Sequence, residues 1–134
     1  MTPQLQKTIL IVDDEPDVTV YLKTFFEDNN FRALTAASAA EGLRLAAAER
    51  PDLITLDITM PGESGVRMYR QLQEDPESAS IPVIIVTGVA HDFKQFIETR
   101  KRIRPPDAYF EKPIDREALL AKVNELLTGC NPST

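Results

Sequence analysis

The sequence predicts an α/β fold: a doubly wound parallel sheet of five strands with five helices around it. Two observations lead to this prediction. Short runs rich in Ile, Val and Leu alternate along the chain with longer segments whose apolar residues recur at helical spacing. The short runs are continuously apolar, which is typical of strands covered on both faces, as in a parallel sheet. We therefore expect one domain with helices on both sides of the sheet.

The chain opens with an apolar strand that leads directly into acidic residues. Thr8–Val12 is rich in β-branched residues and is followed by the acids at 13–15. Pro16 suits the first turn of a helix, whose apolar residues continue at helical spacing to about Asn29. Asn29 and Asn30 are expected to close that helix, and residues 31–36 predict a second, shorter strand.

The next two elements carry the first candidate functional residue. Ser38 and Glu41 form a capping-box pattern, which predicts the start of an Ala-rich helix that ends near Arg50. The third strand, Leu53–Asp57, ends in a carboxylate and is soon broken by a Pro-Gly pair. Ligands of open α/β sheets bind outside the carboxyl ends of the strands, so Asp57 lies where chemistry is expected. Alone, however, Asp57 could simply end a strand and lead into a turn.

The second half of the chain predicts one helix and two strands of clear pattern. They are Ser64–Glu74, Val83–Thr87 and Ala108–Glu111. A helix from about residue 92 to 102 fits the spacing of the aromatic and Ile side chains, and it must end before Pro105. Asp115 is expected to cap the last helix, whose apolar stripe continues to Leu127.

Composition limits the classes of function. The 134 residues allow one domain, which we place at residues 8–128 between an N-terminal extension, 1–7, and a polar tail, 129–134. A net charge of -6 argues against direct binding to nucleic acid. The single cysteine, Cys130, and the absence of a signal peptide or membrane-length apolar stretch predict a cytoplasmic protein. Because the chain ends soon after its last helix, we expect no output domain within it.

The ends of the strands gather polar side chains at one edge of the sheet. In a flavodoxin-like fold with strand order 2-1-3-4-5, the ends of the first and third strands bring Asp13, Asp14 and Asp57 together. Three carboxylates in one pocket repel each other, and a hard divalent ion such as Mg²⁺ would relieve that repulsion. Thr87 and Lys112, after the fourth and fifth strands, add a hydroxyl and an ammonium. This combination suits a phosphoryl group, whose oxygens need charge neutralisation.

Each of these residues also has an ordinary structural interpretation. The acids after the first strand could simply favour a helix N-terminus through the macrodipole. Thr87 could be a strand-end residue, Lys112 a solvated loop lysine, and Tyr109 a half-buried strand residue. Only their joint placement at one edge favours a functional site.

Four motifs in order resemble the response-regulator receiver domain of two-component signalling, over about Thr8 to Leu127. They are residues 11–16, residues 56–62 with Gly65, Thr87 after an apolar strand, and Lys112-Pro113. The resemblance implies that Asp57 is the phosphoacceptor. It also implies a Mg²⁺ site in which Asp14 is a direct ligand, Asp13 lies close by or acts through water, and Asp57 and the Thr59 carbonyl complete the protein ligands.

The same resemblance assigns the groups around the phosphoryl oxygens. Thr87 and Lys112 would bind them, helped by the backbone N–H groups of Thr59 and Gly88. Tyr109 matches the switch aromatic of the family, which turns inward when the threonine is drawn to the phosphate. The resemblance thus implies a switch that repositions the face formed by the fourth helix, the fifth strand and the fifth helix.

The implied partners depend on that chemistry. A sensor histidine kinase or a histidine phosphotransfer protein would donate the phosphoryl group, and a downstream effector or an output domain outside this sequence would read the changed face. The domain would catalyse only its own phosphorylation and dephosphorylation. Homodimerisation on phosphorylation stays open, and we expect no direct contact with nucleic acid or membrane.

Two departures and two rival functions accompany this hypothesis. Gly88 stands where the family usually has Ala, and residues 104–108 replace the usual Gly-Ala lead into the fifth strand, so the signalling face could be reshaped. A haloacid-dehalogenase-type phosphatase would need a second Asp at position 59, where this chain has Thr59. A degenerate interaction module or a nucleotide-binding domain is disfavoured by the intact acids and by the lack of a Gly-rich loop after the first strand.

Overall fold

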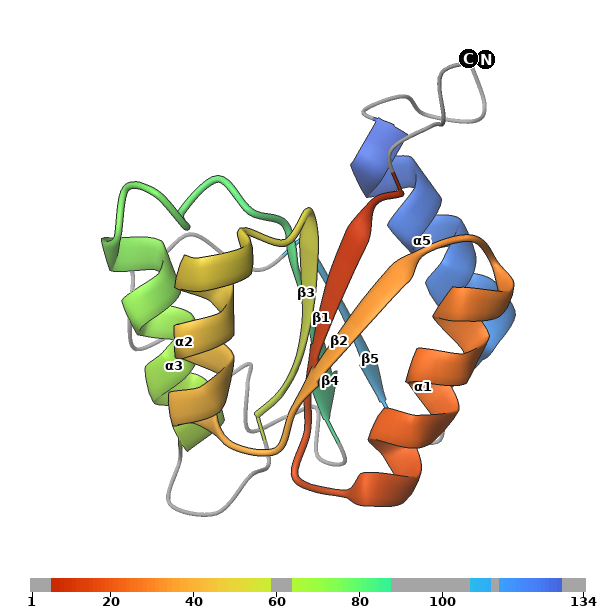
Figure 1. Cartoon of the computed structure of the whole chain (residues 1–134), viewed down its shortest axis with the longest axis horizontal. Helices are drawn as coiled ribbons and strands as arrows, with labels where there is room; N and C mark the ends of the chain where they lie inside the picture. Colours follow the sequence, from red (N-terminus) through yellow and green to blue (C-terminus); the bar gives the residue numbers. More distant parts are fainter. Residues whose placement is uncertain (1–5, 59–63, 88–106, 112–113, 129–134) are drawn as a thin grey trace.

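The computed structural model has a five-stranded parallel sheet between two layers of helices (Figure 1). It describes residues 6–58, 64–87, 107–111 and 114–128. The strands are β1 (Thr8–Val12), β2 (Arg32–Ala36), β3 (Leu53–Asp57), β4 (Val83–Thr87) and β5 (Ala108–Glu111). Their order across the sheet is β2-β1-β3-β4-β5, which confirms the predicted doubly wound fold.

Four helices cover the two faces of the sheet in the described part of the chain. They are α1 (Pro16–Asp28), α2 (Ala39–Glu49), α3 (Ser64–Glu74) and α5 (Arg116–Thr128). Figure 1 shows α2 and α3 against one face, and α1 and α5 against the other. The predicted helix over residues 92–102 lies outside the described residues.

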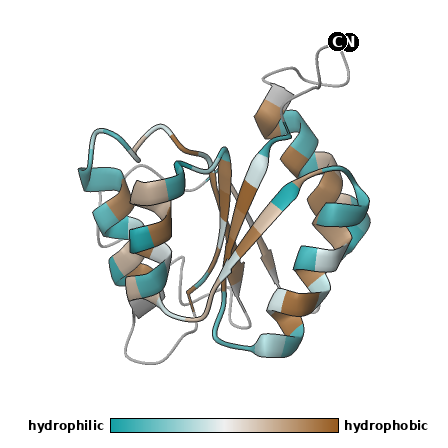
Figure 2. Ribbon diagram, viewed as in Figure 1, coloured by the Kyte–Doolittle hydropathy of each residue, from teal (hydrophilic) through white to brown (hydrophobic). Residues whose placement is uncertain are grey.

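The core is divided by the sheet into two clusters, because successive side chains of a strand point to opposite faces. Leu10 and Leu56 belong to the cluster under α2 and α3, whereas Ile9, Ile11 and Leu53 belong to the cluster under α1 and α5. All residues of β1 and β3 are buried. Figure 2 shows that the strands in the middle of the sheet are mostly hydrophobic. The continuous apolar runs of the sequence thus reflect burial on both faces.

The end of α1 corrects one predicted boundary. The sequence pattern places Phe31 at the start of the second strand, yet its N–H donates to the carbonyl of Phe26 (3.0 Å), and the Asn30 N–H donates to the carbonyl of Glu27 (3.1 Å). These two bonds, with Asn30 at a left-handed φ of 72°, form a Schellman motif. The rings of Phe26 and Phe31 meet edge to face at 6.0 Å. Phe31 therefore completes the helix end, and β2 begins one residue later.

The predicted helix caps are confirmed, with one difference in detail. Ser38 accepts a hydrogen bond from the Glu41 N–H (3.2 Å) at the start of α2, and the Glu41 carboxylate accepts from Ala37 rather than from Ser38 (2.8 Å). Asp115 accepts from two N–H groups in the first turn of α5. At its other end α2 stops at Arg50, which is left-handed with φ 46°.

Candidate functional site

The three predicted acids meet at the carboxyl edge of the sheet. β1 and β3 are neighbours with Val12 opposite Leu56, so the next residues, Asp13 and Asp57, are placed side by side. Asp13 is 3% exposed and Asp57 is 1% exposed, while Asp14 is exposed to solvent. One carboxylate oxygen from each of the three lies within 4.8 Å of the other two. The structure thus confirms that these residues converge.

Backbone hydrogen bonds fix where the two buried acids lie. The Asp13 N–H donates to the carbonyl of Ala36 at the end of β2 (3.1 Å), and its carboxylate accepts from the Glu15 N–H (2.9 Å). After Asp57, the Ile58 N–H donates to the carbonyl of Val86 (3.3 Å), which continues the β3–β4 ladder. Asp57 is therefore held by strands on both sides of β3.

The cluster fits a small divalent cation. Oxygens bound to one Mg²⁺ at about 2.1 Å lie at most about 4.2 Å apart. The oxygens of Asp13, Asp14 and Asp57 are already close to that separation, so small side-chain rotations would allow them to share one ion. An all-carboxylate donor set is also what hard cations prefer. Asp14, as the exposed member, leaves the site open to solvent.

Gly65 supports the end of β3 through a contact that the sequence did not reveal. In the first turn of α3, a Cβ built on Gly65 would lie 2.6 Å from the Ile58 Cα and would also overlap the carbonyl oxygen of Asp57. Only a residue without a side chain lets α3 approach the backbone this closely. The sequence offered Gly65 as part of a motif, but the contact depends on the fold, which brings residues 57 and 65 together.

Other candidate residues are described only in part. Thr87 is the last residue of β4 and is paired with Glu111 of β5, and Tyr109 of β5 is paired with Ile85 of β4. The side chains of Thr87 and Tyr109 lie outside the described structure. Thr59, Gly88 and Lys112 also lie outside the described residues, so their predicted roles stay predictions.

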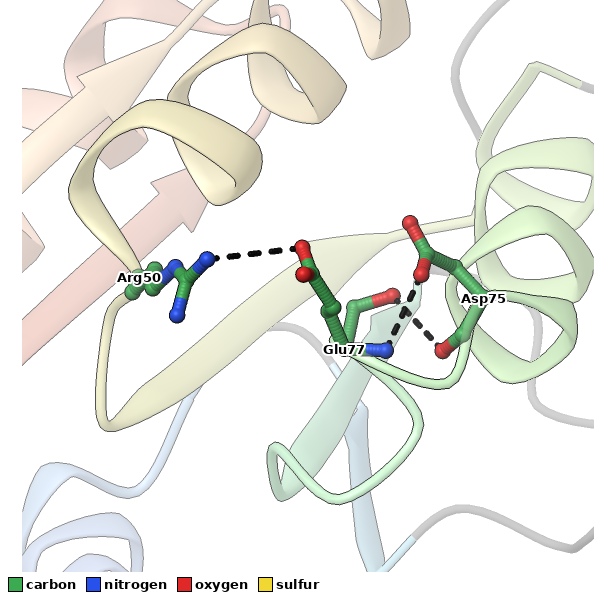
Figure 3. Close-up of polar contacts among 4 residues, drawn as sticks. Arg50, Asp75 and Glu77 are labelled. Atoms are coloured by element: carbon green, nitrogen blue, oxygen red, sulfur yellow. Dashed lines mark hydrogen bonds and ion pairs between the residues drawn. The ribbon is translucent and has the colours of Figure 1, made fainter.

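A cavity of about 260 Å³ lies at the opposite edge of the sheet, between the C-terminal ends of α2 and α3. Three of its lining residues, Arg50, Asp75 and Glu77, are charged and bind one another (Figure 3). Arg50 faces Glu77 at 3.5 Å, and the Glu77 N–H donates to the Asp75 carboxylate at 2.9 Å. Because Arg50 precedes β3 and Asp57 ends it, this cavity is separate from the acids. Its lining indicates no particular ligand. The candidate functional site is therefore the cluster of Asp13, Asp14 and Asp57.

Within the described residues, no helix has the length and apolar character needed to span a bilayer.

Comparisons with known proteins agree with this geometry. Residues 9–124 match the family model described as the response regulator receiver domain. The chain is 39% identical over 121 residues to Protein PilH of Pseudomonas aeruginosa, covering 90% of this chain and 98% of that one. It is 28% identical to the alkaline phosphatase synthesis transcriptional regulatory protein PhoP of Bacillus subtilis, of which it spans only 49%.

A solved structure shows the same fold. The signal receiver domain of a signal transduction histidine kinase from Syntrophus aciditrophicus superimposes with a TM-score of 0.80 at 30% sequence identity. The match covers 94% of this chain and 93% of that one. Since the family model covers most of the chain and the acids converge as predicted, the chain belongs to the response regulator receiver domain family of two-component signalling.

Proposed function

We propose that this chain is a phosphoaspartate switch in which Asp57 accepts a phosphoryl group. The observation that supports this most directly is the convergence of Asp13, Asp14 and Asp57 within 4.8 Å, with Asp57 buried at the end of the central strand β3. Neighbouring carboxylates make phosphoryl transfer to Asp57 unfavourable through charge repulsion when no cation is bound. When a divalent cation is bound, the same acids serve as its ligands, and the cation offsets the repulsion that disfavours phosphoryl transfer.

The proposed transfer is an in-line displacement. A carboxylate oxygen of Asp57 attacks the phosphorus of a phosphohistidine, a P–O bond forms as the P–N bond breaks, and the imidazole leaves with the electron pair. Asp57 is held in place by the β3 ladder and by Gly65, so little reorganisation is needed before attack. Mg²⁺, held by Asp13, Asp14, Asp57 and the carbonyl of Thr59, would neutralise charge on the phosphoryl oxygens.

The remaining roles are proposed by family resemblance. Thr87 and Lys112 bind the phosphoryl oxygens, with the N–H groups of Thr59 and Gly88. Tyr109 follows Thr87 in the switch, and the face of the fourth helix, β5 and α5 changes as a result. We propose a sensor histidine kinase or a histidine phosphotransfer protein as donor, and a downstream effector or a separate output domain as reader. The domain, at residues 8–128, catalyses only its own phosphorylation and dephosphorylation.

Intact mass spectrometry tests this proposal. The protein is incubated with acetyl phosphate and Mg²⁺, beside a Mg²⁺-free sample and the Asp57→Asn variant. Asp17→Asn, which removes an exposed acid in the first turn of α1 outside the cluster, is the matched control. We expect one Mg²⁺-dependent phosphoryl adduct in the wild type and in Asp17→Asn, and none in Asp57→Asn. Absence of the adduct, together with no binding of beryllofluoride as a stable phosphoryl mimic, would overturn the proposal.

A further inference from the structure

Two aspartates hold the amino-terminal ends of the strands by the same arrangement of hydrogen bonds. The Thr8 N–H donates to the Asp52 carboxylate at 2.7 Å, and the Asp52 N–H donates to the Thr8 carbonyl at 2.8 Å. The Val83 N–H donates to the Asp107 carboxylate at 3.0 Å, and the Asp107 N–H donates to the Val83 carbonyl at 3.0 Å. In each pair the aspartate immediately precedes a strand, and its partner begins the neighbouring strand.

We call each of these pairs of hydrogen bonds a clamp. The two clamps join strands that differ in how many neighbouring strands they pair with. Asp52 joins β1 to β3, and each of those strands also has a neighbour on its other side. Asp107 joins β4 to β5, and β5 is an edge strand of four residues whose sheet partner is β4. Loss of the first clamp leaves both strands paired on their other edges. Loss of the Asp107 clamp releases the start of β5, which is hydrogen-bonded within the sheet to β4 alone.

The position of β5 matters because this strand leads directly to a candidate site residue. Phe110 packs against the core cluster under α1 and α5, and Glu111, the last residue of β5, is paired with Thr87 of β4. Lys112 comes directly after Glu111 in the sequence. The clamp at Asp107 therefore fixes the start of the short strand that leads into Lys112.

We infer that Asp107 is a positioning residue for phosphorylation, which acts by holding β5 on β4 so that Lys112 is placed for the phosphoryl group. This inference rests on the proposed function. It assigns different roles to two aspartates that have the same local geometry. Asp107 supports phosphorylation, whereas Asp52 supports only the stability of the sheet. The residue before Ala108 in this chain is thus part of how the site is assembled.

The experiment compares Asp107→Ala with Asp52→Ala and with Asp107→Asn. The two Ala variants each remove the carboxylate bond of one clamp and leave its backbone bond in place. We expect each to lower Tm by a few degrees, the usual effect of one lost hydrogen bond. Asp107→Asn keeps a side-chain oxygen at the same distance from the backbone and is expected to restore the clamp. Phosphorylation by acetyl phosphate with Mg²⁺ is followed by intact mass at a temperature where circular dichroism shows every variant to be folded.

The rates distinguish positioning from stability. We expect Asp107→Ala to be phosphorylated about fivefold more slowly than the wild type, the equivalent of one net hydrogen bond. Asp52→Ala and Asp107→Asn should stay within about twofold. Equal rates in Asp107→Ala and Asp52→Ala, or a failure of Asp107→Asn to restore the rate, would overturn the inference. Should Asp107→Ala not fold, the comparison of Asp107→Asn with the wild type still tests whether the oxygen acceptor is sufficient.

A double-mutant cycle tests whether the effect of Asp107 on the phosphorylation rate depends on Lys112. If Asp107 acts through Lys112, then Asp107→Ala should cause no further loss of rate in a Lys112→Ala background. If the two substitutions instead lowered the rate by independent factors, so that their changes in activation free energy added, Asp107 would act by another route and the inference would be contradicted. Failure of the proposed function itself gives a different result, because the wild type would then take no Mg²⁺-dependent adduct at all.

Discussion

Replacing Gly65 with Ala tests how closely the position of Asp57 depends on α3. The new Cβ would lie 2.6 Å from the Ile58 Cα and would overlap the Asp57 carbonyl oxygen. Both atoms belong to the backbone, so no change of rotamer can relieve the contact. To reach an ordinary separation of about 3.4 Å, the Cβ must move about 0.8 Å away from the Ile58 Cα, and further from the closer Asp57 carbonyl oxygen, so helix and strand must separate by about 1 Å. Overpacking of this kind costs about 1–3 kcal/mol.

The expected loss of function is larger than the loss of stability. A displacement of about 1 Å in a reacting group can lower a rate by about 100-fold, because attack requires alignment of the acceptor oxygen with the phosphorus. We therefore expect Gly65→Ala to remain folded, with its free energy of unfolding lowered by about 1–3 kcal/mol, and to be phosphorylated about 10- to 100-fold more slowly. Urea unfolding and the time course of the phosphoryl adduct measure the two effects separately.

Gly42→Ala is the matched control, since it adds the same methyl group to another buried helical glycine. Its Cβ would lie 2.9 Å from the Met68 Cε and 3.0 Å from the Val12 Cγ2. The end of a methionine side chain can move aside, and the exchange of Gly for Ala within a helix gains up to about 1 kcal/mol. Gly42→Ala should keep a rate close to that of the wild type. If Gly65→Ala also did so, the contact would not position Asp57 and the reasoning would be refuted.

Three further predictions concern separate features. Arg50→Gly should raise the free energy of unfolding by up to about 1 kcal/mol in urea titrations, because glycine tolerates the left-handed φ of 46° and the exposed pair with Glu77 contributes little; a lower stability would contradict this account of the α2 end. Ser38→Ala should cost about 1 kcal/mol by the same measurement, through loss of the cap on Glu41, and an unchanged midpoint would argue against the cap. Mg²⁺ should raise Tm in thermal melts by mass action, and Asp14→Ala should weaken this response, whereas excess EDTA should abolish it; an equal response in the variant would exclude Asp14 as a ligand.

The sequence predicted the features that depend on local pattern. The strands were recognisable because burial on both faces makes them continuously apolar, and the cap at Ser38 because the capping box is written within four residues. Asp13, Asp14 and Asp57 could be brought together because a doubly wound sheet places the ends of its first and third strands side by side. The candidate site thus followed from pattern and topology together.

Features that depend on contacts across the sheet could not be predicted in this way. Asp52 and Asp107 are ordinary loop acids in the sequence, and their clamps appear only when the neighbouring strands are placed in register. The overlap at Gly65 depends on the path of α3 over the end of β3. The apolar side chain of Phe31 continues the run of the next strand, although its N–H completes the hydrogen bonds of the helix before it.

The interior position of β1 in the sheet also has a consequence for the nascent chain. β1 lies between β2 and β3, and it is the first of the strands to be synthesised. Its pairing with β3 must wait for about 45 further residues, which at about 5–20 residues per second takes roughly 2–9 s. During that interval a strand of five apolar or β-branched residues has an unpaired edge, the kind of edge that favours contacts between chains. β1, which is buried along its whole length in the finished protein, is therefore the strand that waits longest for its second neighbour during synthesis.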